Sequence, residues 1–186
     1  TTARGSSLST HVVAQSPEAG APVLPNLTIG VASYNQDQPT NASGIPFGSP
    51  SDLSYLLAPP PRTIPNGVET RLAAFQNCNA AALGPDAAYQ AAVSRAATLI
   101  QQEASASFQL SGDTPEMQRI RALYGLVTGR ESGSAATAAT AAQAIKTGLA
   151  QCVTVRLQDG LDQHTGWADT HPVLLTEGFA ALAALL

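Results

Sequence analysis

Apolar side chains recur at intervals of three and four residues through the later part of the chain, which is the spacing of an amphipathic helix. This spacing predicts helices over residues 66–83, 84–108, 114–129 and 171–186, and the Ala-rich composition of residues 132–150 predicts another between the last two. Thr114 as N-cap and Pro115 at the first helical position begin the third helix, and Gly129 is placed to end it. The fourth helix is almost entirely Ala and Thr, so it has little bulk to bury before Ile145.

β-Branched and apolar residues gather in two shorter stretches, which predict strands. One lies at 26–34, in a segment (residues 1–67) that holds ten of the chain's thirteen prolines, and the clearer one lies at 151–159. Residues 51–57 have room for two helical turns, with Ser51 as the N-cap candidate. Because proline removes a backbone donor and restricts the residue before it, we expect residues 1–67 to be irregular apart from one short strand.

The order of the later elements indicates an α/β fold. A helix, a turn at Gly148, a strand, an acidic loop and a final helix follow one another. We predict a single domain, with residues 68–186 as its helical and strand-loop-helix part and residues 1–67 as its irregular part. The final helix stops at Leu186 without a capping residue, so we expect this domain to be truncated at its C-terminus. In such folds, ligands bind at the carboxyl ends of the strands.

Composition narrows the classes of partner. Nine Lys and Arg against thirteen Asp and Glu give a net charge of -4, and the basic residues form no stripe, which argues against nucleic acid and anionic membranes. No apolar run approaches the roughly 20 residues that span a bilayer. The sequence contains no P-loop, GxGxxG or GxSxG motif, so nothing in it indicates a nucleotide cofactor or a serine hydrolase with a nucleophile elbow.

Cys78, Cys152 and His11 are reactive side chains outside the acidic loop. The two cysteines are far apart, and neither belongs to a CxxC pair. They are compatible with one disulfide in an oxidising compartment or with two inert thiols, and the sequence leaves both open. His11 lies beside several hydroxyl residues, but a Ser-His pair depends on a geometry that sequence distance does not give.

The loop after the second predicted strand carries the strongest chemical signal. Residues 159 to 171 include three Asp and two of the chain's three His, in a chain that is only 12% charged. Carboxylates and imidazoles are ligands for divalent ions such as zinc, manganese or calcium. Residues i and i+2 of an extended segment share a side, so Asp162 pairs with His164, and Asp169 with His171. We predict Asp162 and His164 as metal ligands, with Asp159, Asp169 and His171 as secondary candidates for the metal or its surroundings.

Structural roles compete with these chemical ones. Asp169 or Thr170 is a candidate N-cap for a helix with Pro172 at its first position, and capping alone would then explain Asp169. Trp167 is interpreted either as the apolar anchor of the loop or as an aromatic lid over a ligand. The first Asp-x-His pair has no such structural explanation.

The segment "CVTVRLQDGLDQHTGWADTHPVLLTEGFAALAALL" resembles part of an uncharacterised family of exported bacterial proteins in the alkaline phosphatase and sulfatase superfamily. That family has a hydrophobic strand, a Gly-aromatic-Asp-Thr-His motif and a helix rich in Ala and Leu. Asp162 and His164 match the Asp and His of the motif, whereas Leu161 replaces the aromatic residue and Gln163 the Thr. The resemblance covers about thirty-five residues specifically, and the family's later Ser-Glu-Phe-Gly-Arg and Asp-His motifs would follow Leu186.

The resemblance implies the helix-rich part of an alkaline-phosphatase-like layered fold with few strands, in a periplasmic or secreted protein. It also implies a metal-dependent hydrolase of phosphate or sulfate esters, whose metal ligands come from loops along the whole chain. Asp162 and His164 would then be a partial site, completed by other segments of the same polypeptide or by another subunit. The alternative is a non-catalytic secreted protein that uses this fold for binding or assembly. The number of ligands separates the two, because a hydrolase needs at least three protein ligands around an open metal position.

Overall fold

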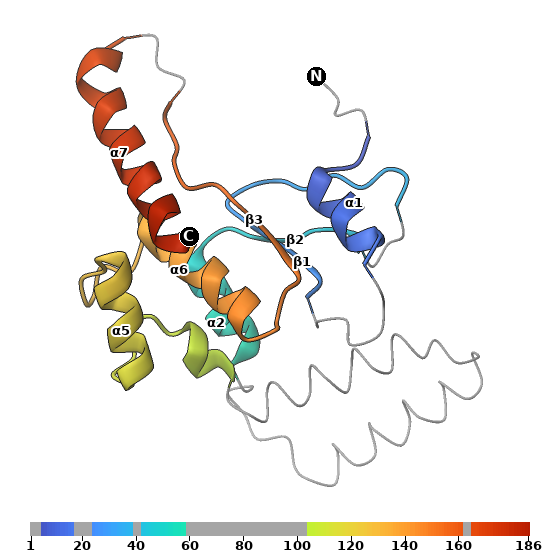
Figure 1. Ribbon diagram of the computed structural model, residues 1–186, viewed down its shortest axis with the longest axis horizontal. Coiled ribbons are helices and arrows are strands. Elements are labelled where there is room, and N and C mark those ends of the chain that lie inside the picture. Colours follow the sequence, from blue (N-terminus) through green and yellow to red (C-terminus); the bar gives the residue numbers. More distant parts are fainter. Residues whose placement is uncertain (1–4, 17–23, 39–41, 59–103, 162–164) are drawn as a thin grey trace, which may run out of the picture.

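The computed structural model describes residues 5–16, 24–38, 42–58, 104–161 and 165–186, which form a small parallel sheet flanked by helices (Figure 1). This is the α/β class that the sequence predicts. The helices of the described residues are α1 (Leu8–Ala14), α2 (Pro50–Leu57), the short 3-10 helix η2 (Ala104–Phe108), α5 (Pro115–Tyr124), α6 (Gly133–Lys146) and α7 (Trp167–Leu185). The helix predicted at 66–83, most of the one predicted at 84–108, and Cys78 lie outside the described residues.

The sheet contains β2 (Ile45–Phe47), β1 (Asn26–Ile29) and β3 (Cys152–Val155), in that order and all parallel. β1 and β3 fall inside the two predicted strands. The prediction of a single strand in residues 1–67 is wrong, because β2 also forms although Pro46 stands at its centre. Proline is tolerated there because β2 is an edge strand. The Phe47 carbonyl accepts the Gly30 N–H, so the backbone groups of Phe47 face β1. Those of the preceding residue, Pro46, face away from β1, and the sheet loses no hydrogen bond through its missing N–H.

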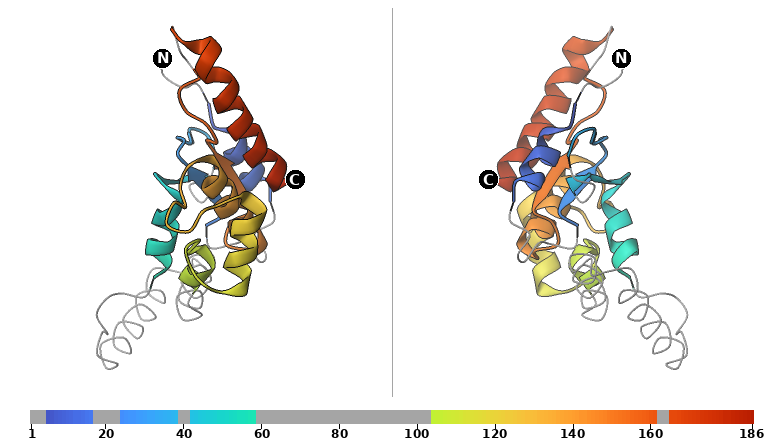
Figure 2. Two further views of the ribbon diagram at one scale, coloured as in Figure 1. Left: turned by 90° about the vertical axis from the view of Figure 1, so that its left-hand side faces the viewer. Right: turned by 90° about the vertical axis from the view of Figure 1, so that its right-hand side faces the viewer.

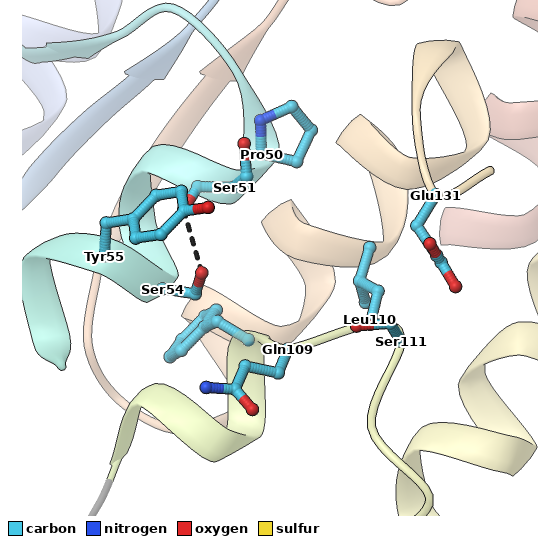
Figure 3. Close-up of a pocket in the computed structure, with 9 residues that line it drawn as sticks. Pro50, Ser51, Ser54, Tyr55, Gln109, Leu110, Ser111 and Glu131 are labelled. Atoms are coloured by element: carbon cyan, nitrogen blue, oxygen red, sulfur yellow. Dashed lines mark hydrogen bonds between the residues drawn. The ribbon is translucent and has the colours of Figure 1, made fainter. Parts of the chain in front are cut away.

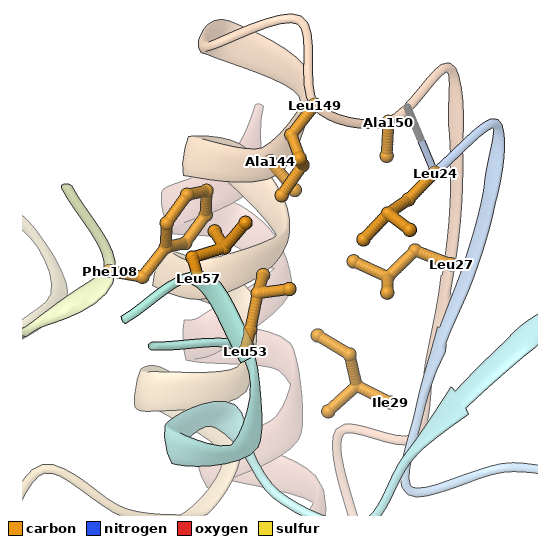
Figure 4. Packing of buried hydrophobic residues seen from close by; sticks show 9 residues of the cluster. All are labelled: Leu24, Leu27, Ile29, Leu53, Leu57, Phe108, Ala144, Leu149 and Ala150. Carbon is orange, nitrogen blue, oxygen red and sulfur yellow. The ribbon is translucent and has the colours of Figure 1, made fainter. Parts of the chain in front are cut away.

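Alternation along β1 separates an apolar face from a polar one. Leu27 and Ile29 pack in the main core against side chains of α2, η2 and α6 (Figure 4). Asn26 and Thr28 point to the opposite face. All four side chains are buried, which makes β1 the centre of the described structure. Figure 1 shows α1 on one side of the sheet and α2 and α6 on the other.

Small side chains let α6 pack closely on its neighbours. Its buried positions are mostly Ala and Thr, among them Ala136, Ala139 and Ala144, and they face the sheet, α5 or α7. The prediction that burial of bulk begins at Ile145 is wrong, because that side chain is 49% exposed and Ala144 turns to the core instead. Small side chains, mostly Ala and Thr, therefore form the contact surface of α6.

The start of α5 is as predicted, and its end is not. The Thr114 hydroxyl oxygen accepts a hydrogen bond from the Met117 N–H at 3.2 Å, and Pro115 occupies the first helical position. The helix ends at Gly125, which has a φ of 63°, rather than at Gly129. Gly125 comes before Gly129 in the chain, and as a glycine it adopts the left-handed conformation without steric cost. The Leu126 N–H then donates to the Arg121 carbonyl at 2.8 Å and caps the C-terminus of the helix.

The N-cap of α2 is Ser49, so the prediction of Ser51 is wrong by two residues. Pro50 takes the first helical position, and the Asp52 carboxylate accepts the Ser49 N–H at 2.9 Å in a capping box. Because proline is favoured at that first position, it moves the helix start ahead of the serine that the sequence suggested.

Helix α7 lies along α6 and extends away from the sheet toward its own N-terminus (Figure 2). Ala181 is its only buried residue, whereas Val173, Phe179 and Leu182 are exposed. No described helix is both long enough and apolar enough to cross a lipid bilayer.

Candidate functional site

The three strands end at a common cavity. Parallel strands place their carboxyl ends at one edge of a sheet, and a cavity of about 430 Å³ opens there. The residues that follow the strands line it together with the start of α6 and one side chain of α7. Its lining is Ile29, Gly30, Gly48, Ser49, Pro50, Ser132, Gly133, Ser134, Thr137, Arg156, Leu157, Gln158, Asp159 and Glu177. This is the position at which open α/β sheets bind ligands.

Arg156 is held at this edge by the sheet itself. As the first residue after β3, it continues the ladder, because its N–H donates to the Ile29 carbonyl at 3.0 Å. Its side chain lies over Gly30, where an added Cβ would be 3.7 Å from both Cβ and Nε of Arg156. Gly30 has a φ of 69°, so it turns the chain directly after β1 and leaves no side chain between β1 and the guanidinium.

Asp159 is the ion-pair partner of Arg156. Arg156 Nη1 and Asp159 Oδ1 are 3.0 Å apart, and the two side chains are 52% and 72% exposed. Water therefore reaches both charges, which makes the pair weak and easily exchanged. The carboxylate predicted as a secondary metal candidate is thus engaged with a cation in this structure.

The start of α6 forms a second wall of the cavity. The Ser134 hydroxyl contacts the Leu157 carbonyl oxygen and Gln158 Oε1, and so fastens the helix to the segment that follows β3. The N-cap residue, Ser132, makes no side-chain capping hydrogen bond. Ser132, Gly133 and Ser134 line the cavity, so the first turn of α6 and the positive end of its dipole lie there.

Glu177 of α7 adds a carboxylate to the cavity wall. The neighbouring residue, Gly178, brings α7 against the segment after β3, since an added Cβ there would lie 3.6 Å from the Gln158 Cβ. The charged side chains that line the cavity are therefore one cation, Arg156, and two carboxylates, Asp159 and Glu177.

The acidic loop is only partly described. Asp162 and His164, the predicted metal ligands, lie outside the described residues. Within the described ranges, no three His, Cys, Asp or Glu side chains are grouped so that they could hold a metal ion. The secondary candidates Asp159, Asp169 and His171 therefore do not make a metal centre by themselves, and the described residues alone do not fit the metal that the resemblance implies.

His171 ties the start of α7 to the loop. Its Nε2 is hydrogen-bonded to the Leu161 carbonyl oxygen, and its ring meets Trp167 edge-on, with centroids 6.4 Å apart at 77°. Trp167 is 62% exposed and does not line the cavity. The structure thus gives Trp167 a contact within the first turns of α7 rather than a place over the cavity.

The predicted cap of the last helix is wrong. Helix α7 begins at Trp167 after Gly166, which has a φ of 71°, and neither Asp169 nor Thr170 is the N-cap. Asp169 lies instead in the first turn, where a carboxylate faces the positive end of the dipole, and Pro172 lies inside the helix. A glycine in the left-handed region began the helix earlier than the side-chain signals suggested.

The hydroxyls around His11 have structural partners. The Ser7 hydroxyl oxygen accepts the Tyr34 N–H at 2.8 Å, and the Thr10 hydroxyl donates to the Tyr34 carbonyl at 3.2 Å. Ser6 bonds to Asp37, so these residues fasten α1 to the segment after β1. Among the described residues, no hydrogen bond joins His11 to a hydroxyl, and the Ser-His pairing considered from the sequence gains no support.

A second hollow, of about 300 Å³, lies between α2 and the residues that follow η2 (Figure 3). Figure 3 shows Ser54 and Tyr55 on one side and Gln109 and Leu110 on the other. The Ser54 hydroxyl donates to the Ser51 carbonyl at 2.8 Å, and Glu131 accepts the Gly129 N–H at 2.8 Å. Ser54 and Glu131 therefore serve local structure, and the cavity at the sheet edge, where the strand ends meet, is the stronger candidate site.

Sequence reasoning missed Arg156, the start of α6 and Glu177. Only Arg156 carried a signal, as the first charged residue of the strand predicted at 151–159. No protein-family model, curated protein or solved structure matches this chain. The resemblance to the exported family therefore remains an interpretation of the sequence motif.

Proposed function

We propose that this chain is part of an exported hydrolase of phosphate or sulfate esters, and that the ester binds in the cavity at the carboxyl edge of the sheet. The observation that carries the proposal is the convergence of all three strand ends on a cavity that contains Arg156 and the start of α6. The loop with the Asp-x-His motif begins at the same edge, at Asp159.

The chemistry of the lining supports an anionic ligand. A guanidinium offers two parallel N–H donors to a phosphate or sulfate group. The first turn of a helix offers backbone N–H groups and a positive dipole end. Arg156 and the start of α6 lie on the same cavity, so both kinds of donor are available to one ligand.

Metal binding by Asp162 and His164 is a separate proposal. Asp162 follows Asp159, which lines the cavity, by three residues in the sequence. The described residues supply no three-ligand group by themselves, so a site at Asp162 and His164 would need at least one further ligand, from the secondary candidates, from other segments or from another subunit.

One observation favours the alternative of a non-catalytic secreted binding protein. Among the described residues that line the cavity there is no histidine, so none of them supplies an imidazole to activate a serine of the lining. In this case the same cavity would bind an anionic ligand without cleaving it.

Hydrolysis of an aryl phosphate and an aryl sulfate, with and without added zinc or manganese, tests the function directly. The proposal expects turnover that depends on the metal and is lost in Asp162→Ala and His164→Ala. Asp113→Ala is a matched control, because Asp113 is exposed and does not line the cavity. Absence of turnover in a chain that binds metal would support the binding alternative.

The metal content of the same variants tests the ligand assignment. If Asp162 and His164 are ligands, each alanine variant loses bound metal, since two remaining donors hold an ion poorly, whereas Asp113→Ala keeps it. Unchanged metal content in both variants would reject the two residues as ligands.

A further inference from the structure

We propose that Arg156 binds a tetrahedral oxyanion, the phosphate or sulfate group of a ligand, and that Asp159 is its exchangeable counter-ion rather than a metal ligand. This inference rests on the proposed function for the place of the site and deepens it by assigning the residues that recognise the anionic group. The observations that carry it are the ion pair, the position of the guanidinium over Gly30, and the cavity that both residues line.

The backbone and Gly30 together restrict Arg156. Its N–H is fixed to the Ile29 carbonyl, and the side chain rests against a residue without a Cβ. A long cation on a free loop would lose much rotamer freedom on binding an anion. A guanidinium already placed at the cavity loses less, and its planar fork matches two oxygens of a tetrahedral group.

The ion pair leaves Arg156 available. A buried pair with Asp159 would hold the guanidinium permanently, but both side chains here are more than half exposed. Exposed pairs of this kind contribute little, so an anion that offers two oxygens can replace the single carboxylate contact. Asp159 then competes with the ligand, which is the opposite of what a metal ligand would do.

The surrounding groups complete the site. Ser132 at the N-cap of α6 makes no side-chain capping bond, and the first turn of α6 lines the cavity. Glu177 is the other carboxylate of the lining, and it stays in place when Asp159 is changed. Substitution of Asp159 therefore removes one competing charge and leaves the rest of the cavity as it is.

Titration of the isotope-labelled chain with inorganic phosphate, followed by the backbone amide signals in the presence of EDTA, tests the assignment. We expect shifts at Gly30, Gly133 and Ser134. Arg156→Gln should weaken binding about tenfold or more, because a charge-assisted contact is lost. Asp159→Asn should tighten it about twofold to fivefold, because the competing carboxylate is gone.

Two further variants protect the interpretation. Arg119→Gln is the matched control, since Arg119 is an exposed arginine of α5 that does not line the cavity, and its affinity should equal that of the parent chain. Arg156→Lys keeps the charge and loses the fork, so it should bind more weakly than the parent chain and more tightly than Arg156→Gln. If Arg156→Gln does not fold, Arg156→Lys carries the test.

Several results would overturn the inference. Equal affinity in Arg156→Gln and the parent chain would remove the arginine from the site, and weaker binding in Asp159→Asn would show that the carboxylate supports the ligand. Binding that is seen in a titration without EDTA and is absent with EDTA would assign the anion to a metal. A parallel titration with sulfate identifies the anion: binding of either one supports the site, and binding of neither rejects it.

The inference and the proposed function fail separately. Phosphate binding that depends on Arg156, without ester hydrolysis, would retain the oxyanion site and reject the hydrolase. Ester hydrolysis that Arg156→Gln leaves unchanged would retain the hydrolase and reject the oxyanion site.

Discussion

Gly44 shows how one missing side chain allows the chain after β1 to close on the sheet. A Cβ at this position would lie 2.4 Å from the Ser33 Cβ and 2.9 Å from Cγ2 of Thr28. Thr28 is completely buried on the central strand, so it has little room to retreat, and Ser33 belongs to the segment that leaves that strand. Glycine is required at this position by close packing and not by its backbone conformation.

Gly44→Ala should therefore lower the free energy of unfolding by about 1–3 kcal/mol, the usual effect of overpacking a filled interior. Gly178→Ala is the matched control, because its Cβ would make only an ordinary contact with Gln158 in a helix that favours alanine. Chemical denaturation of both variants measures the difference. Equal stability of Gly44→Ala and the parent chain would mean that Ser33 or the backbone shifts freely.

At the residue scale, the site could be predicted only in part. The sequence predicted chemistry in the loop after the strand at 151–159, because Asp and His residues cluster there. It did not show that Arg156 lies over Gly30 or that it pairs with Asp159. The contact with Gly30 depends on the parallel register of β1 and β3, which joins residues that are more than a hundred positions apart, whereas the pair with Asp159 is between residues three apart.

At the element scale, side-chain caps explain two of the helix starts. In α2 the Asp52 carboxylate accepts the N–H groups of Gly48 and Ser49, each at 2.9 Å. The hydrogen bond with the Ser49 side chain is the largest cause, and these backbone donors add to it, in holding the pKa of the Asp52 carboxyl below its ordinary value. The box therefore stabilises α2 only while Asp52 is ionised.

Asp52→Asn should destabilise the chain at neutral pH by about 1 kcal/mol or less, because the cap is exposed to solvent. A lowered pKa in the folded state gives a contribution that is complete above the unfolded-state pKa, near 4, and is lost as the pH falls through the folded-state pKa. The difference between Asp52→Asn and the parent chain should then shrink with acid.

Urea denaturation at several pH values measures that difference. Asp113→Asn is the control, because the Asp113 side chain makes no hydrogen bond or ion pair within the described structure. A difference that grows toward low pH would contradict the role given to Asp52.

Helix boundaries were predicted less well than helix positions. α5, α6 and α7 all lie where the sequence predicted helices. In α5 the three-and-four spacing reflects burial of one face, which includes Met117 and Ile120. The end of α5 and the start of α7 were decided by Gly125 and Gly166, which adopt positive φ values, although other residues offered equally plausible caps. Which glycine adopts a positive φ depends on the direction that the following segment takes in the fold, and the local sequence does not specify that direction.

At the scale of the whole molecule, the reactivity of the Cys152 thiol measures how well the folded chain protects β3. Cys152 lies half-buried in β3, and burial raises the pKa of its thiol. Less thiolate and less access both slow alkylation, so Cys152 should react several times more slowly in the native chain than after denaturation. Timed iodoacetamide labelling with peptide mass spectrometry measures both rates, and equal rates would contradict the burial of β3.

The same labelling of the denatured, unreduced chain counts its thiols. Two thiols would exclude a bridge between Cys78 and Cys152, and none would establish it, as an oxidising compartment outside the cytoplasm favours. This count bears on the proposed export of the protein independently of its activity.

The sequence by itself determined the α/β class, the strand before the acidic loop, the capped start of α5 and the small residues along α6. These features follow from local periodicity and local hydrogen bonding, which a short segment already contains. Only the tertiary structure decided the sheet order, the presence of β2 beside β1, and the meeting of Arg156, Asp159, Glu177 and the start of α6 at one cavity. The physical reason is that pairing and packing between distant segments place these groups together, and no spacing along the chain records that contact.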